Sequence, residues 1–224
     1  MNKLLCEEML NLLETRLIEE LEKYELFQDP RINCSPRAIG DTVQEVIGDV
    51  LPYCLPTGVI DNFNSSFARR AMEDVAFYDT DGNYYAIDIK THNLSTKFNM
   101  PNLISVERLS RFYRDEKRYF VILLIEYSVY DGQLTFTKAH FVPIEHLDWS
   151  CLTIGALGWG QIQIINSNHV LICRENSRID WMLSLCNAMD LFYPKEIEKI
   201  TDRITYFQSV RAYWENKKSE NIDY

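Results

Sequence analysis

The sequence predicts an α/β fold in which a mixed β-sheet is flanked by α-helices. Apolar residues recur at helical spacing near both ends of the chain, at about 2–26 and 178–217. Strand-length apolar runs fill the middle, where Asp-Gly pairs at 81–82 and 131–132 each separate two such runs. Helices, hairpins and further helices in this order predict a sheet with helices packed on its faces.

The composition fits one domain over residues 1–224. Hydrophobic residues make up 46% of the chain, enough for a substantial core. No apolar run reaches about 18 uncharged residues, so we expect no membrane-spanning segment. Glutamates interrupt the N-terminal apolar pattern, which argues against a secretory signal. The six cysteines lack C-x-x-C spacing, which predicts reduced thiols and a cytoplasmic location.

The first expected helix, at 2–26, has an apolar face of the kind that packs on a core. A dimer interface with a second subunit is the alternative use of that face. A second helix is expected over about 38–51, before the break at Pro52. The later elements are expected in this order: hairpin 74–91, loop 92–101, helix 102–116, strands 119–130 and 134–142, hairpin strands 161–165 and 170–173, and helices over 178–217 interrupted at Pro194.

The formal net charge of −10 is unusual for a protein that binds nucleic acid. The charge is nevertheless unevenly distributed, because residues 1–26 are rich in glutamate and most of the charged residues in 90–118 are basic. A local basic surface can therefore still bind an anionic partner such as a nucleic acid. Its side chains would be Lys90, Lys97, Arg108, Arg111, Arg114, Lys117 and Arg118.

The hairpin at 74–91 carries three ionisable groups at one end. Side chains alternate along a strand, so Asp88 and Lys90 share a face, about 6.6 Å apart along the backbone. The isoleucines next to them point the other way, into apolar packing. The turn at 81–82 brings Asp74 alongside Asp88. Two carboxylates and an ammonium at the end of a buried hairpin predict a site for a hard divalent cation and a phosphate.

Two other acid-x-Lys triplets occur, at 115–117 and 215–217. Both lie in charged segments with no apolar strand before them, whereas Asp88-Ile-Lys90 closes an apolar run. A structural ion pair at a strand end remains the alternative interpretation of Asp88 and Lys90.

The hairpin and the residues after it resemble the PD-(D/E)xK nucleases, in particular the HincII-like type II restriction endonucleases. The run Asp88-Ile-Lys-Thr-His-Asn-Leu-Ser, followed by Pro101-Asn-Leu-Ile-Ser, is similar to their Asp-x-Lys-Thr, Asn-x-Ser and Pro-Asn-x-Ile-Ser. The later Gly158-Trp-Gly-Gln-Ile-Gln-Ile resembles a Gln-Ile-Gln strand of that family, and EcoRV-like enzymes share Ala-Ile-Asp-Ile-Lys-Thr. The proline of the superfamily name is absent, since Glu73 precedes Asp74.

The resemblance implies a restriction-endonuclease-like fold and a catalytic site that holds Mg²⁺. Asp74, Asp88 and the Ile89 carbonyl would ligate the ion, because Mg²⁺ prefers oxygen ligands. Lys90 would stabilise charge at the scissile phosphate and help orient or deprotonate the attacking water. Glu45 resembles a glutamate that many members carry on a helix near the metal, and a solvated helix position is its alternative. Glu73 is the alternative carboxylate if Asp74 does not take the metal-ligand role.

The resemblance also implies DNA contacts from two segments. The first, after Lys90, is an ordinary polar loop in the alternative interpretation, with Asn102 capping the next helix. The second departs from the family around Gly155, so the resemblance does not extend to the target sequence. Asn and Gln side chains suit base edges. The expected contacts are Thr91, Asn93, Lys97, Phe98, Asn99 and Asn102 in the first segment and Gly155, Trp159, Gln161 and Gln163 in the second.

Together these observations predict a type II restriction endonuclease. It would use Mg²⁺ to hydrolyse double-stranded DNA at a short near-palindromic site, and the resemblance implies that the cut leaves blunt ends. The family implies a homodimer and a companion DNA methyltransferase. Two alternatives remain: a structure-directed repair or recombination nuclease, and a catalytically silent DNA-binding module. The presence of Asp74, Asp88 and Lys90 argues against the silent module.

Overall fold

The computed structural model describes residues 2–66 and 71–220. The chain divides into two compact units that meet between Arg178 and Ile179. All strands belong to the first unit, and the second consists of helix α5 beyond its first residue. Within the described residues, no helix is long and apolar enough to cross a membrane.

A five-stranded mixed sheet forms the centre of the first unit. β3 and β5 run parallel, and all other neighbouring strands are antiparallel. Parallel neighbours require a crossover connection, and here the crossover contains a short strand and a helix. The predicted α/β class, a mixed sheet flanked by helices, is confirmed. In spatial order the strands are β1 (Ile60–Asn64), β2 (Val75–Asp79), β3 (Tyr84–Asn93), β5 (Arg118–Tyr130) and β6 (Gln133–Pro143).

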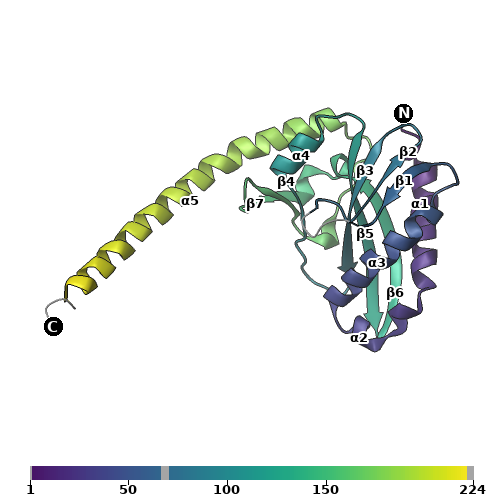
Figure 1. The fold of residues 1–224 in the computed structure, drawn as a ribbon, viewed down its shortest axis with the longest axis horizontal. Helices are drawn as coiled ribbons and strands as arrows, with labels where there is room; N and C mark the ends of the chain where they lie inside the picture. Colours follow the sequence, from purple (N-terminus) through teal and green to yellow (C-terminus); the bar gives the residue numbers. More distant parts are fainter. Residues whose placement is uncertain (1, 67–70, 221–224) are drawn as a thin grey trace. The chain divides into compact units, whose positions relative to one another are not determined.

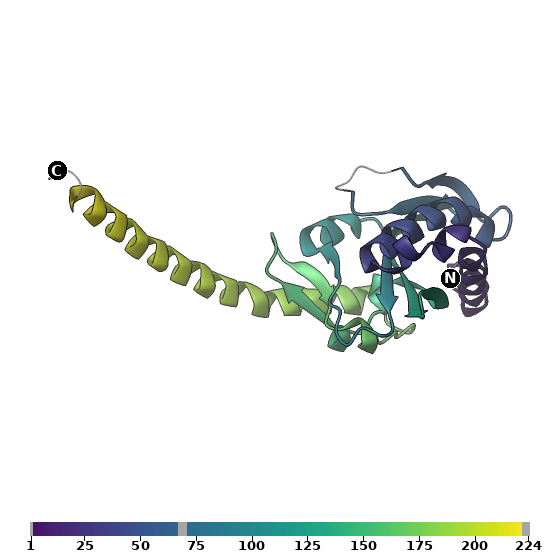
Figure 2. The same ribbon diagram turned by 90° about the horizontal axis from the view of Figure 1, so that it is seen from below.

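Helices α1 (Glu7–Glu22) and α3 (Pro36–Cys54) cover one face of this sheet (Figures 1 and 2). Leu10, Leu13, Leu17 and Leu21 of α1 are fully buried in the core that α3 and the sheet share, so the chain's own core occupies the face predicted to pack or dimerise. α3 continues through Pro52 to Cys54, beyond its expected end. Pro52 lies in the final turn, where only the last hydrogen bonds are affected. The short helices are η1 (Glu25–Gln28), α2 (Pro30–Asn33), η2 (Ile144–His146), η3 (Trp149–Cys151) and η4 (Ser167–His169).

A three-stranded antiparallel sheet, in the order β4 (Asn102–Ser105), β8 (Gln161–Ile164) and β7 (Leu152–Gly155), is joined to α4 (Val106–Phe112). The helix expected from 102 therefore begins four residues later. Ser105 caps it by accepting a hydrogen bond from the Arg108 N–H, because the preceding residues pair with β8 instead. The expected pairing of 161–165 with 170–173 is wrong, since β8 pairs with β7 and β4. Apolar alternation identifies a strand but not its partner.

Helix α5 (Arg178–Glu220) is a single helix of 43 residues with Pro194 inside it. The expected interruption at Pro194 is wrong. A proline removes one backbone hydrogen bond and crowds the preceding turn, but its fixed φ is compatible with a helix. The residues before and after Pro194 form one uninterrupted helix. Figure 1 shows this helix as gently curved.

Candidate active site

The β2–β3 hairpin brings Asp74 to Asp88, as the sequence predicts. Val75 pairs with Ile87, so Asp74 lies opposite Asp88 at the end of the paired region. The Asp74 backbone N–H donates to the Ile87 carbonyl at 2.8 Å, and Asp74 Oδ2 accepts from the Ile89 N–H at 2.7 Å. The Ile89 N–H would normally donate to the backbone carbonyl of a neighbouring strand residue. Here the side-chain carboxylate of Asp74 accepts that hydrogen bond instead.

The predicted alternation along β3 is confirmed. Ile87 and Ile89 belong to the core beneath α1 and α3, while Asp88 and Lys90 meet on the other face. Lys90 Nζ lies 2.6 Å from Asp88 Oδ1, and both side chains are mostly buried. A lysine held this way is a positioned cation, in contrast to a mobile surface lysine.

The carboxylate of Asp88 is only partly compensated by its surroundings. Among the described residues, its Oδ2 is buried without a hydrogen-bond partner. Burial raises the pKa of Asp88 to about 7, Lys90 opposes this rise, and Asp74 adds to it. Burial also raises the pKa of Asp74, against the opposing hydrogen bond from Ile89 and the charge of Lys90. A cation beside both carboxylates would relieve the burial cost that raises both pKa values.

The donor set at this point suits Mg²⁺. The described residues contain no cluster of three or more His, Cys, Asp or Glu side chains that could hold a metal. Mg²⁺ does not need such a cage, because it keeps several waters and binds through one or two carboxylates and substrate phosphate. The Ile89 carbonyl points to the same strand edge as its N–H, beside Asp74 and beyond the last paired residue of β2. Asp74, Asp88 and this carbonyl therefore fit the predicted ion.

Helix α3 contributes a residue that the sequence did not reveal. Gln44 Nε2 donates to Asp74 Oδ1 at 2.7 Å. Glu45, the predicted helical carboxylate, is exposed on the next position of the helix, about 100° around the axis. One signal was present, because Gly40 lies one turn earlier and a Cβ there would be 3.3 Å from Thr91 Oγ1. This glycine allows α3 to approach β3 closely enough for Gln44 to reach the site.

Glu73, the substitute for Asp74, points elsewhere: it accepts a hydrogen bond from the Tyr84 hydroxyl at 3.3 Å.

Asp88 opens into a cleft of about 400 Å³ between β3, α4 and the small sheet. The cleft combines carboxylate, cationic, amide and indole side chains, which suits a polar, anionic ligand. Trp159 and Gln161 are predicted DNA contacts, whereas Arg108 of α4 is predicted only as part of the basic surface. The basic segment 90–118 was the only signal for it. Besides Asp88, the polar and aromatic residues of the lining are Ser105, Glu107, Arg108, Trp159 and Gln161.

The small sheet brings together predicted DNA contacts from both segments. Gln163 Nε2 donates to Asn102 Oδ1 at 2.5 Å across the β4–β8 pair. A Cβ at Gly155 would meet the Gln163 side chain at 2.4 Å, so the absence of a side chain at 155 leaves room for that amide. Gln161 shares this face, because Ile162 and Ile164 alternate into the core. The result is a face of amides next to the cleft.

The loop at 92–101 is held by hydrogen bonds to η4 and within the loop itself. Asn99 Nδ2 donates to Ser167 Oγ at 3.4 Å, and Asn168 Nδ2 donates to the Lys97 carbonyl at 3.1 Å. Asn93 Oδ1 accepts from the Ser95 N–H at 2.9 Å. The amides of Asn93 and Asn99 thus organise the loop, and neither residue lines the cleft. Lys97 and Phe98 have exposed side chains on this loop.

The basic segment is less available than its composition suggests. Arg111 pairs with Glu107 at 2.6 Å, and Arg118 pairs with Asp115 at 3.2 Å. Lys117 donates to the Asp81 carbonyl at 3.1 Å. Lys90 and Arg108 are the members that reach the Asp88 site and its cleft.

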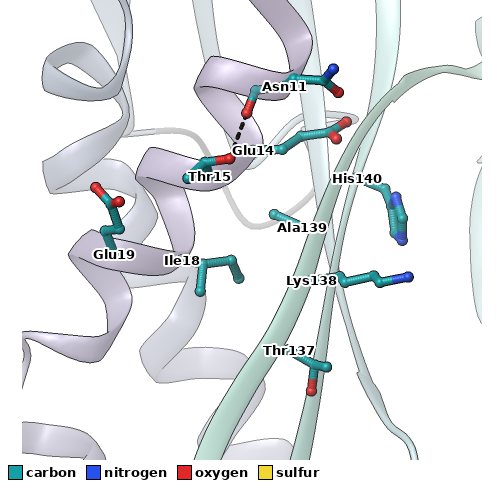
Figure 3. A pocket seen from close by; sticks show the side chains of 9 residues that line it. All are labelled: Asn11, Glu14, Thr15, Ile18, Glu19, Thr137, Lys138, Ala139 and His140. Carbon is teal, nitrogen blue, oxygen red and sulfur yellow. Dashed lines mark hydrogen bonds between the residues drawn. The ribbon is translucent and has the colours of Figure 1, made fainter.

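A second cavity, of about 470 Å³, lies between α1 and β6, away from the hairpin site (Figure 3). Its principal carboxylate is already engaged, since Glu14 Oε1 accepts from the Phe141 N–H at 2.9 Å and lies 3.6 Å from Arg174 Nη2. His140 faces Glu126 at 3.8 Å. We therefore place the chemistry at Asp88, although the cavity there is slightly smaller.

No protein-family model matches the chain, and no curated protein matches it.

Proposed function

We propose that the chain is a Mg²⁺-dependent, site-specific deoxyribonuclease of the type II restriction class on a restriction-endonuclease-like fold. The observation that carries this proposal is the placement of Asp74, Asp88 and Lys90 together at one end of a buried hairpin, where Asp88 lines a polar cleft. Phosphodiester hydrolysis needs a cation, a positioned ammonium and room for a phosphate, and this arrangement supplies the protein's part of each.

Each residue has a separate task in the proposed reaction. Asp74 is held from two sides, by Gln44 and by the Ile89 N–H, so its orientation is fixed before substrate arrives. Asp88 supplies buried negative charge, and Lys90 beside it offers N–H donors to a phosphate oxygen and to the attacking water. Bound Mg²⁺ would supply Lewis acidity at the phosphate and lower the pKa of a water.

The proposed substrate is double-stranded DNA. Arg108 in the cleft suits a phosphate, and the amides of Asn102, Gln161 and Gln163 on the small sheet suit base edges. Trp159, 59% exposed at the cleft, adds a surface on which a base or sugar can pack. These features support sequence-dependent contacts near the cut.

The proposed dimer follows from two-fold DNA symmetry. A short near-palindromic site is cut on both strands by a homodimer with one active site per strand. We further propose blunt ends, a companion methyltransferase that protects host DNA, and a cytoplasmic location. The six free thiols suit that reducing compartment.

Digestion of a long DNA of known sequence tests the proposal. Purified protein with Mg²⁺ should give discrete fragments, and sequencing of their ends should return one short motif. EDTA and the Asp88→Asn variant should each abolish the cut. Cutting only at junctions or flaps would replace the restriction class with a structure-directed nuclease. Selective binding without cleavage would indicate a silent DNA-binding module.

A further inference from the structure

Helix α5 carries an exposed apolar face that the rest of its own unit cannot cover. Beyond Tyr193, large apolar side chains recur with alternating spacings of four and three residues, the a and d pattern of a heptad. Only one position of the series, Arg211, is not apolar. Their relative exposures are Tyr193 41%, Ile197 65%, Ile200 49%, Ile204 55%, Phe207 67% and Trp214 65%.

Such a face is costly for a helix in water. Long isolated helices are stabilised mainly by packing of an apolar face, and exposed apolar stripes of this length mark contact surfaces. Asp202, Thr205 and Ser209 occupy the opposite side, and Tyr206 and Tyr213 are exposed next to them, so the a and d stripe is the continuous apolar face of the helix but not its only exposed apolar surface.

We infer that this face binds the same face of a second copy of the chain, with the two α5 helices antiparallel. Two copies of a heptad stripe fit together. In an antiparallel pair, each side chain at an a position packs next to a side chain at a d position of the partner helix. One register that aligns six layers pairs Ile204 with the partner's Phe207, Ile200 with the partner's Arg211, and Ile197 with the partner's Trp214. A two-fold axis then passes between residues 205 and 206.

Charge favours the antiparallel direction. Two parallel helices in register would stack Arg211 against its own copy at the centre of the seam, whereas the antiparallel pair separates the two guanidinium groups. The antiparallel register also sets Glu196 beside the partner's Lys217, twice by symmetry. Each of these residues already pairs within its helix, with Lys199 and Glu220 respectively at 2.7 Å, so the new contact would extend an existing ion pair.

The area is sufficient for a specific dimer. Aromatic side chains bury about 150–250 Å² each when fully covered. Three aromatics and three isoleucines on each helix, about half exposed now, would bury on the order of 1,000 Å² together, which is the lower bound for a specific interface. The pairing provides a surface for the proposed homodimer, and its failure would leave the nuclease chemistry intact.

The mass of the full chain in solution, without DNA or metal, tests the pairing. Wild type should be a dimer at micromolar concentration by sedimentation equilibrium, and Ile200→Asp/Ile204→Asp should weaken self-association by at least 100-fold. The matched variant Thr205→Asp/Ser209→Asp, on the opposite side of α5, should remain a dimer. Circular dichroism spectra that match wild type in the strand and helix signals show that the variants are folded.

Cross-linking tests the direction. Under mild oxidation, a mixture of Glu196→Cys and Lys217→Cys chains should give more disulfide-linked dimer than either variant alone, because like positions are about 30 Å apart in the antiparallel pair. A monomeric wild type would overturn the inference and indicate that the face packs on its own chain. A dimer that survives Ile200→Asp/Ile204→Asp would also overturn it.

Discussion

Gln44 on α3 donates a hydrogen bond to Asp74 at the start of the β2–β3 hairpin, with 2.7 Å between Nε2 and Oδ1. The opposite oxygen of Asp74 accepts from the Ile89 N–H. These two contacts fix the carboxylate in the plane where it can face Asp88. An amide in this place supports Asp74 without adding a third negative charge beside two carboxylates whose pKa values are already raised.

Removal of the Gln44 amide should therefore weaken metal binding. Outer contacts that orient a metal ligand are typically worth 10–100-fold in affinity or activity. We expect Gln44→Ala to raise the Mg²⁺ concentration for half-maximal cleavage by about 10-fold. The neighbouring Glu45→Ala serves as the matched control, because Glu45 is exposed and should change this concentration less than twofold. A larger effect at Glu45 than at Gln44 would restore the predicted role of Glu45.

Asp88 should limit the stability of the metal-free protein above neutral pH. Its pKa is raised from 3.8 to about 7. Between these two pKa values the folded state keeps a proton on Asp88 that the unfolded state has lost. The stabilisation from this proton is therefore full below about pH 4 and is lost as the pH rises through 7. Asp88→Asn removes the buried charge but leaves Lys90 without its partner. We expect the free energy of unfolding at pH 8 to rise by about 1–3 kcal/mol.

Urea unfolding at pH 5 and pH 8 measures this effect. The gain from Asp88→Asn should be larger at pH 8 than at pH 5, and cleavage should be lost at both. Asp131→Asn, in an exposed turn at a residue with φ of 49°, is the matched control and should change little at either pH. A variant less stable than wild type at pH 8 would show that the ion pair with Lys90 outweighs the burial of Asp88.

The same carboxyl should make metal binding depend on pH. Protons compete with Mg²⁺ for a carboxylate whose pKa is about 7, so affinity should rise with pH and level off above that value. We expect apparent Mg²⁺ affinity at pH 6 to be about 10-fold lower than at pH 8. Calorimetric titration of the free protein with Mg²⁺ or Mn²⁺ across this range gives the profile. A constant affinity would place the ion away from Asp88.

The amide face of the small sheet should affect which sequences are cut. Gln163→Ala removes the partner of Asn102 and a base-edge donor and acceptor. A well-placed amide contact contributes about 1–3 kcal/mol of discrimination, so the ratio of cleavage at the preferred site to a one-base variant should fall by about 5–100-fold. Thr153→Ala, cross-strand from Gln163, is the control. Uniform loss at both DNA sites would indicate a structural role instead.

The geometry of the β2–β3 hairpin was predictable because its determinants are local. Period-two alternation and the Asp-Gly turn fix which residues of β3 share a face, and the structure agrees for Asp88 and Lys90. Gln44 was not predictable, since its role depends on how α3 is rotated against β3, a relationship set by packing across the core. The segment Asn102–Ser105 likewise looks like the start of a helix, yet a strand about 60 residues away provides its pairing.

The two other acid-x-Lys triplets show what local context contributes. The triplet 115–117 lies in the exposed turn after α4, and the triplet 215–217 lies on exposed α5. Neither places its lysine against a buried carboxylate, whereas Lys90 contacts Asp88. The apolar strand before the motif, rather than the triplet itself, carried the prediction.

Single-turnover cleavage by lysine variants tests most directly that this hairpin is a nuclease active site. A long double-stranded DNA would be incubated with Mg²⁺ and an excess of wild type, Lys90→Ala or Lys117→Ala. Lys117 belongs to the exposed triplet at 115–117, so it controls for loss of a lysine next to an acid. The account predicts that Lys117→Ala cuts at nearly the wild-type rate and that Lys90→Ala is slower by at least about 1,000-fold while still binding DNA. Equal rates for wild type and Lys90→Ala would contradict it.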